Sequence, residues 1–451
     1  MICRTALALS HALVPKADGW RPTSIDSIDS EVVDARCHWE DEDDADMCVV
    51  VLEAVEDAWA VQVDELGFVP PMPDDDGILD LYLSSHGTGG GAYTYGPSSD
   101  EDTTDGRMGC HSYIALSPMI GETIMPSYVA HEFQHVLQYA TDFVEPTYAI
   151  WEGVATAAQE WTYPDEQAGN YETPDFQAYP WAGLLNDSYA LYDDHDVWSY
   201  YEYGAVIWIQ HLEAFYGDGL GSSGVQLWAE ATQTGWDNEP DVIDAYDAVT
   251  GDWIFALMDL SVERAKLGTV HASDWIENRE APMYQVEIDT ALDATELPIT
   301  LDPTTAPYQT GVVYVQVSGF GAGEWLGASI SASSQVQWGI VFVEGSDSDW
   351  AEGTSYSWLA GGDDITVGIV NLGPSDFDGD DQLKQSSFSL TLGVGEAPDT
   401  GAGAGGGAGA GDSASADQKT GCGCATAAPR SGGLLGLLGF VFWARRRSTS
   451  D

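Results

Sequence analysis

The stretch MPSYVAHEFQHVLQYATD, residues 125–142, contains the clearest chemical motif of the chain, HEFQH at residues 131–135. Pro126 suits the first turn of a helix, and no glycine or proline interrupts residues 127–140, so the stretch predicts a helix. At roughly 100° per residue, the apolar side chains fall opposite the two histidines. These apolar side chains are Val129, Phe133, Val136 and Ala140. The histidines therefore share the other face, one turn apart, which is a spacing at which two imidazoles can bind one metal ion.

A third candidate ligand, Glu152, follows in the segment IWEGVATAAQE. It is the only charged residue between Glu145 and Glu160, in a run whose other residues predict burial. A buried carboxylate without a partner is costly, and a metal ion shared with His131 and His135 would remove that cost. Glu160 competes for this role but lies at the polar end of the predicted helix. The alternative to a metal site is a pair of surface histidines on an amphipathic helix.

The combination of HEFQH and a downstream W-E-G-x-A resembles the gluzincin metallopeptidases, and the local sequence is similar to secreted bacterial peptidases of the hyicolysin-like kind. The resemblance extends over residues 48–265. It implies a zincin-like domain in which His131, His135 and Glu152 bind Zn²⁺. It also implies that Glu132 is the general base, which takes a proton from a metal-bound water as that water attacks a peptide bond.

Many gluzincins carry a tyrosine or histidine that stabilises the oxyanion of the reaction. Here Tyr203, at the start of YGAVIWIQHLEAFYG, is the expected donor. Tyr200, Tyr201 and the upstream His195 are the other candidates, and packing aromatics are the alternative for all three tyrosines. Closer to the N-terminus, HGTGGGAYTYG at residues 86–96 predicts a glycine-rich turn, and a hairpin or surface loop is the alternative.

Changes of composition divide the body of the chain. Residues 1–15 form a weak signal-like segment, and residues 16–47 are polar and acidic and predict an extended leader. The zincin-like domain, expected to be α+β, covers residues 48–283. Runs such as VVYVQVS and WGIVFVEG then predict an all-β, sandwich-like module over residues 284–397.

The C-terminal end consists of a Gly/Ala-rich linker, residues 398–420, and a tail, residues 421–451. The tail contains Cys422, Cys424, a short apolar stretch that predicts a helix, and three arginines at residues 445–447. This order resembles the C-terminal sorting tails of myxobacterial surface proteins. The resemblance implies a secreted protein at the cell surface, outer-membrane associated or released, that meets a membrane only through its tail. An ordinary single-pass tail anchor is the alternative.

Cys3 lies in the signal-like segment, and the three cysteines between that segment and the linker fit an oxidising compartment. Cys37 and Cys48 flank an acidic loop and can close it, but Cys110 can pair with either of them, so the pairing stays open. Residues 376–381, DFDGDD, have the carboxylate density of a Ca²⁺ loop, and a solvated acidic turn is the alternative.

The overall charge narrows the range of partners. The 14 basic and 74 acidic residues give a formal net charge of −60, which disfavours nucleic acid as a partner. Together with the resemblance, the chain predicts a monomeric, secreted and surface-retained zinc endopeptidase that acts on proteins or peptides. One alternative is a surface adhesion or binding protein whose zincin domain is catalytically inactive. Another is a zinc hydrolase of non-peptide amides.

Overall fold

The computed structural model describes residues 21–72, 76–85, 88, 91–96, 106–165, 169–233, 239–272, 275–379 and 383–395. All of these belong to the first of two units of the chain, which ends at Ala408. The signal-like segment, the Gly/Ala-rich linker and the C-terminal tail lie outside the described residues. Among the described helices, none is both long enough and apolar enough to cross a membrane.

A five-stranded mixed sheet forms the N-terminal part, in the strand order β1-β2-β3-β5-β4. Strands β2, β3 and β5 run parallel, whereas β1 and β4 pair antiparallel at the two edges. The three leucines of β3 are buried, as expected for a strand inside a sheet. The strands are β1 (Asp26–Asp29), β2 (Ala35–Trp39), β3 (Leu79–Leu83), β4 (Ala92–Tyr95) and β5 (Tyr113–Leu116).

The expectation of an extended leader over residues 16–47 is wrong for the described part of that segment. Strands β1 and β2 lie within it and belong to the same sheet as β3. Cys37 of β2 forms a disulfide with Cys48 of α2 (Ala45–Ala58), and Cys110 is a buried thiol. The acidic composition did not indicate these strands, because the edge strand β1 is largely exposed and carries polar side chains.

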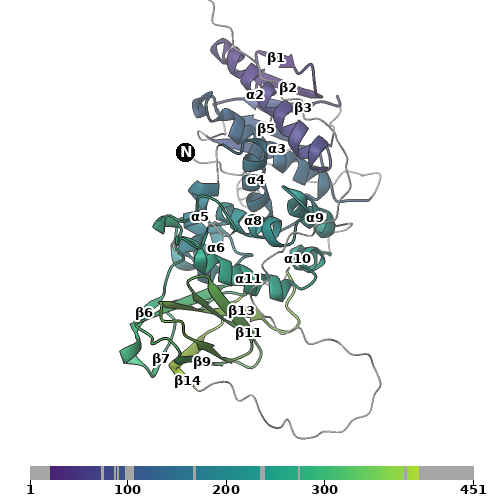
Figure 1. The fold of residues 1–451 in the computed structure, drawn as a ribbon. Coiled ribbons are helices and arrows are strands. Elements are labelled where there is room, and N and C mark those ends of the chain that lie inside the picture. The colour runs from purple at the N-terminus through teal and green to yellow at the C-terminus, as the bar shows by residue number, and fades with distance from the viewer. Residues whose placement is uncertain are drawn as a thin grey trace, which may run out of the picture. The chain divides into compact units, whose positions relative to one another are not determined.

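Helices make up most of the chain between β5 and residue 266, and α3 packs against both α2 and α4 (Figure 1). Helix α2 continues into a π-helical segment, η2 (Trp59–Glu65). The remaining α-helices are α3 (Met125–Thr141), α4 (Tyr148–Thr162), α5 (Gly169–Ala178), α6 (Ser188–His195), α7 (Tyr201–Gly204), α8 (Val206–Phe215), α9 (Ser222–Ala231), α10 (Val242–Thr250) and α11 (Trp253–Lys266). Short 3₁₀ turns are η1 (Glu42–Asp44), η3 (Pro118–Ile120), η4 (Pro180–Ala182), η6 (Pro282–Tyr284) and η7 (Ala294–Glu296).

Two sheets form the C-terminal part, with the strand orders β11-β10-β13-β8-β6 and β12-β9-β14-β7. Side chains from both sheets, such as Val315, Ile340 and Leu392, share one apolar core. The strands are β6 (Thr290–Asp293), β7 (Ile299–Leu301), β8 (Val312–Ser318), β9 (Trp325–Ala332), β10 (Gln337–Glu344), β11 (Asp347–Glu352), β12 (Ser355–Leu359), β13 (Ile365–Gly373) and β14 (Phe388–Gly395).

Helix α11 packs against strands β10 and β13 on the face of their sheet that points away from this core. Tyr314 of β8 donates a hydrogen bond to the Ser261 carbonyl of α11 at 2.7 Å. Gly339 of β10 leaves room for Met258 of α11, since a side chain there would collide with the Met258 sulfur. The β-rich part therefore shares a packed interface with the helices.

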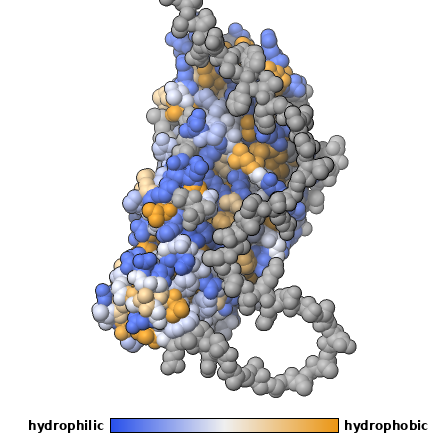
Figure 2. Space-filling model, viewed as in Figure 1, coloured by the Kyte–Doolittle hydropathy of each residue, from blue (hydrophilic) through white to orange (hydrophobic). Residues whose placement is uncertain are grey.

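The surface agrees with the acidic composition of the chain. Figure 2 shows that hydrophilic residues predominate on the viewed face, with smaller hydrophobic groups between them. Few of the described aspartates and glutamates are buried, so the excess of carboxylates falls mainly on the solvated surface.

Candidate metal centre

Helix α3 (Met125–Thr141) carries the HEFQH motif, and the predicted helix is confirmed. Pro126 occupies its first turn, where the missing N–H of proline costs no helical hydrogen bond. The side chains of His131 and His135 are only 1% and 0% exposed, however. The alternative of two surface histidines is therefore wrong. Helix α4 packs against α3 and buries the imidazoles between the two helices.

Three ligand-type atoms meet between α3 and α4. His131 Nε2 lies 3.1 Å from His135 Nε2, and Glu152 Oε2 lies 3.2 Å from the first nitrogen and 3.4 Å from the second. Ligands at about 2.0–2.1 Å from a tetrahedral zinc ion stand roughly 3.3 Å apart. The triangle therefore has the size of one face of a zinc coordination tetrahedron. Within the described part of the chain, these residues are the group of three whose ligand atoms all lie within 4.8 Å of one another.

The electrostatics of Glu152 suit an anionic ligand. Burial by itself raises the pKa of this carboxyl, but the charge of His135 and hydrogen bonds from both histidines outweigh it and lower the pKa to about 2. Burial depresses the pKa of His135, and the negative charge of Glu152 more than compensates and raises it. The carboxylate is thus ionised at neutral pH, as binding of a metal ion requires.

Glu160, the competing ligand, is engaged elsewhere. Its carboxylate accepts hydrogen bonds from the Gly169 backbone N–H at 2.8 Å and from Gln210 Nε2 at 2.6 Å. The guanidinium of Arg279 lies 3.6 Å from it. Glu152, and not Glu160, therefore faces the histidines.

Glu132 is fully buried beside this triangle on α3. Its Oε2 accepts a hydrogen bond from Thr94 Oγ1 at 2.8 Å, and the same hydroxyl lies 2.9 Å from the Glu132 backbone carbonyl. Thr94 belongs to β4, the edge strand of the five-stranded sheet, so the expected glycine-rich turn is wrong for residues 92–95. Thr94 is not among the site residues predicted from the sequence, although the alternation of small and aromatic residues in AYTY is a signal for a strand.

The four candidates for an oxyanion donor occupy different places. The ring of Tyr203 on α7 stacks on His131, with 5.8 Å between centroids and 18° between planes. Tyr200 lies edge-on to Tyr203 at 6.1 Å. Tyr201 is buried, and its hydroxyl donates to the Gly183 carbonyl at 2.6 Å.

His195 lies in a separate group at the end of α6. Its ring packs edge-on against Trp181 at 4.5 Å between centroids, and its Nε2 lies 3.4 Å from the Tyr308 hydroxyl. These contacts give His195 a packing role at the interface between α6 and the segment that precedes β8. Of the four candidates, Tyr203 is the one whose ring stacks on a member of the triangle.

Two glutamines that the sequence analysis did not single out contact the outer nitrogens of the histidines. Gln159 Oε1 lies 3.1 Å from His131 Nδ1, and Gln138 Oε1 lies 2.6 Å from His135 Nδ1. A glutamine in a helix gives no sequence signal for such a role, since glutamine is common on helices of any kind.

The acidic segment at residues 376–381 is described only up to Gly379. Within it, Asp378 faces Asp241, the N-cap residue of α10, and Gly379 packs against the Asp241 carboxylate. Burial, then hydrogen bonding and charge repulsion from Asp378, raise the pKa of Asp241 to about 7. A Ca²⁺ ion at residues 376–381 stays a prediction.

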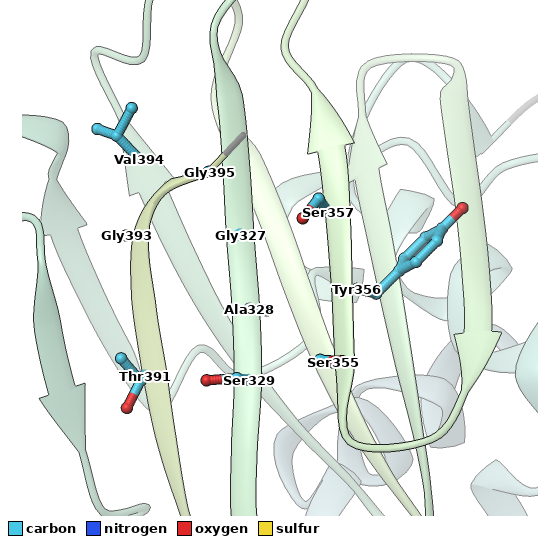
Figure 3. A pocket seen from close by; sticks show the side chains of 10 residues that line it. All are labelled: Gly327, Ala328, Ser329, Ser355, Tyr356, Ser357, Thr391, Gly393, Val394 and Gly395. Atoms are coloured by element: carbon cyan, nitrogen blue, oxygen red, sulfur yellow. The ribbon is translucent and has the colours of Figure 1, made fainter. Parts of the chain in front are cut away.

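A shallow hollow of about 510 Å³ lies on the four-stranded sheet of the β-rich part (Figure 3). Small residues of β9, β12 and β14 line it, including Gly327, Ser357 and Thr391. None of its lining residues belongs to the metal-ligand triangle, so this hollow is not part of the candidate centre.

No family model and no curated protein matches the chain. Among solved structures, the chain has a weak similarity to a family GH115 4-O-methyl-alpha-glucuronidase, BtGH115A, with specificity for decorated arabinogalactans. The sequence identity is 8%, the match covers 74% of this chain and 54% of the other, and the TM-score is 0.16. A TM-score this low supports no conclusion about fold or activity, so the argument for function depends on the residues of the centre.

Proposed function

We propose that this protein is a secreted, surface-retained zinc endopeptidase with a zincin-like catalytic domain. The observation that carries the proposal is the buried triangle of His131 Nε2, His135 Nε2 and Glu152 Oε2, with sides of 3.1, 3.2 and 3.4 Å. Two neutral nitrogen donors and one ionised oxygen donor suit Zn²⁺. The size of the triangle agrees with this metal, and a second carboxylate, Glu132, lies next to it on α3.

The metal ion would supply Lewis-acid chemistry at the fourth coordination position, where it would make water a better nucleophile near neutral pH. The protein residues would carry out the proton transfers. Glu132 takes the proton of the attacking water and later returns it to the leaving amine. The Thr94 hydroxyl holds the carboxylate of Glu132 in one orientation through its 2.8 Å hydrogen bond.

Tyr203 would stabilise the charge that develops on the carbonyl oxygen of the substrate. Its ring stacks on His131, so the phenol lies beside one member of the ligand triangle. A hydrogen bond from a phenol hydroxyl is stronger to an oxyanion than to a neutral carbonyl. The phenol would therefore stabilise the transition state more than the bound substrate.

The test measures metal content and peptide hydrolysis on the purified full-length chain. We expect about one zinc per chain by mass spectrometry and cleavage of a quenched fluorescent peptide library. Glu152→Ala should lose the zinc, because one ligand of three is removed. Glu132→Gln should keep the zinc and lose hydrolysis, because an amide cannot accept the proton.

The outcomes separate the alternatives. A wild-type chain without zinc would overturn the proposal. Zinc binding without peptide cleavage would favour the adhesion or binding protein, and cleavage confined to small amides would favour the non-peptide hydrolase. Full turnover by Glu132→Gln would remove Glu132 from the mechanism.

A further inference from the structure

The second ring nitrogen, Nδ1, of each histidine of the triangle lies within hydrogen-bond distance of a glutamine side chain. His131 Nδ1 lies 3.1 Å from Gln159 Oε1, and His135 Nδ1 lies 2.6 Å from Gln138 Oε1. The Nε2 atoms of the same rings point at Glu152 and at each other. Both rings are therefore held at two ends, with the glutamines on the outer side of the triangle.

The amide nitrogens of both glutamines also form hydrogen bonds. Gln138 Nε2 donates to the Trp151 carbonyl at 3.0 Å, and Gln159 Nε2 donates to Ser127 Oγ at 2.9 Å. A backbone carbonyl can only accept, so the amino group of Gln138 must face Trp151 and its oxygen must face His135. This contact decides which way the amide of Gln138 points, without reference to any metal.

The two glutamines run in opposite directions between the helices. Gln138 reaches from α3 to the α4 backbone immediately before Glu152, whereas Gln159 reaches from α4 to His131 and Ser127 of α3. One contact is made at His131 and the other at His135, so each histidine of the triangle has its own glutamine. Each glutamine therefore connects the helix that carries the histidines to the helix that carries the glutamate.

We propose that Gln138 and Gln159 are positioning residues of the metal centre, an inference that rests on the proposed zinc function. An amide oxygen accepts a hydrogen bond only from a protonated Nδ1, so both imidazoles keep their proton there and present the Nε2 lone pair to the metal. The centre already holds two buried carboxylates, Glu132 and Glu152. Neutral acceptors orient the rings without adding negative charge to this buried site.

The experiment compares zinc affinities of full-length variants by competition with a chromophoric chelator. Gln159→Leu and Gln138→Leu keep the approximate volume of the side chain and remove the acceptor. We expect zinc affinity to fall by about 10–100-fold in each, the range found when outer partners of metal-binding histidines are lost. Gln159→Glu keeps an acceptor, and the Ser127 hydroxyl can rotate to donate to it, so this variant should bind zinc at least as tightly as the wild type.

Gln134 offers a matched control on the same helix. It is fully buried, and its amide atoms have no hydrogen-bond partner among the residues that the structure describes. Gln134→Leu removes a buried glutamine from α3 without removing a contact to His131 or His135, and we expect its zinc affinity to stay within about two-fold of the wild type. A similar loss in this control and in Gln159→Leu would show a general effect of helix repacking and overturn the inference.

A second measurement detects the proposed hydrogen bonds directly. In zinc-loaded, ¹⁵N-histidine-labelled protein, we expect exchange-protected Nδ1–H resonances for His131 and His135. The His131 resonance should lose its protection in Gln159→Leu and the His135 resonance in Gln138→Leu. Unchanged zinc affinity and unchanged protection in both leucine variants would overturn the positioning role and leave the zinc enzyme intact. A wild type that binds no zinc would instead overturn the proposed function.

Discussion

Glu132 on α3 and Glu152 on α4 differ in chemistry because their carboxylates contact different groups. Glu152 Oε2 lies 3.2 and 3.4 Å from two imidazole nitrogens, which suits the ligand role proposed for it. Glu132 Oε2 accepts from the Thr94 hydroxyl, so it is placed beside the ligands and oriented from another strand. At the scale of single residues, the division of labour in the centre depends on these contacts.

Replacing Thr94 by valine tests how much this orientation contributes. Valine keeps the shape of threonine and loses the hydroxyl, so the Glu132 carboxylate loses its 2.8 Å hydrogen bond. We expect kcat to fall by about 10-fold, in line with a loss of about 1.4 kcal/mol of transition-state stabilisation, and zinc content to stay constant. Thr94→Ser should restore kcat, whereas equal rates in the valine and serine variants would contradict a role for the hydroxyl.

Tyr203 allows a second test at this scale. Tyr203→Phe keeps the ring that stacks on His131 and removes the hydroxyl. Removal of one oxyanion donor costs roughly 100-fold in kcat or more, so we expect a loss of this size with zinc content and KM little changed.

The neighbouring tyrosine provides the control. Tyr201→Phe removes a buried hydrogen bond to the Gly183 carbonyl, which should lower stability by about 1–2 kcal/mol. Its kcat should stay near that of the wild type. If Tyr201→Phe lowered kcat as much as Tyr203→Phe does, the phenol of Tyr203 would not be the specific donor.

At the scale of elements, the centre depends on how closely short helices approach one another. Helix α7, which carries Tyr203, packs against α5 and α4. Its last residue, Gly204, lies so close to α5 that a Cβ there would be 2.5 Å from Phe176 Cβ and 2.6 Å from the Glu172 carbonyl. The carbonyl is backbone and cannot turn away, so α7 would have to move.

We therefore expect Gly204→Ala to lower both stability and catalysis. Overpacking of this kind costs about 1–3 kcal/mol, which denaturant unfolding would detect. Because Tyr203 precedes Gly204, kcat should fall as well, while zinc stays bound by α3 and α4. Gly251→Ala is the comparison, since Gly251 has open space around it but a positive φ of 75°. This variant should lower the free energy of unfolding and leave kcat unchanged. Loss of zinc from Gly204→Ala would contradict the separation between ligand helices and α7.

At the scale of the whole molecule, the protein carries a net charge of −60 and buries several carboxyls. Burial is the largest influence on Glu145 and Glu202 and raises the pKa of each to about 8. Asp241, whose pKa is raised to about 7, faces a second carboxyl, Asp378, across the contact between α10 and the segment that follows β13. As pH rises through neutral to alkaline values, these carboxyls lose their protons. The negative charges that result lie in buried positions and lower the stability of the fold.

Asp241→Asn tests this effect. The folded-state pKa of Asp241 lies above the ordinary value of 3.8, so the folded state holds the proton more tightly than the unfolded state. The stability from this proton is present at low pH and is lost as pH rises from about 4 to about 7. Asparagine caps helices as well as aspartate does, so the variant should be more stable than the wild type by about 2 kcal/mol at pH 8. The difference should vanish at pH 4 in denaturant unfolding.

Calcium provides the control for the same pair. A Ca²⁺ ion between Asp241 and Asp378 would offset their repulsion, so it should raise the melting temperature of the wild type and not that of Asp241→Asn. No calcium effect on the wild type would favour the solvated acidic turn. A variant less stable than the wild type in calcium-free buffer at pH 8 would contradict the repulsion itself.

The sequence by itself determined the local part of this protein. Helical periodicity predicted the helix that carries HEFQH, and one turn of an α-helix brings His131 and His135 together whatever surrounds them. A lone charge in an apolar run indicated Glu152 as the residue that needs a partner. The strands after residue 284 could also be predicted from the sequence, because hydrophobic period and composition are properties of short segments.

Only the tertiary structure decided the remaining features, because they join residues that are distant in the chain. Thr94 reaches Glu132 across 38 positions, and Gln159 reaches His131 across 28 positions. The burial of the histidine face, the stacking of Tyr203 on His131 and the place of β1 and β2 in the sheet depend likewise on which surfaces pack together. Packing of this kind is set by the complementarity of whole helices and strands, which no short stretch of sequence contains.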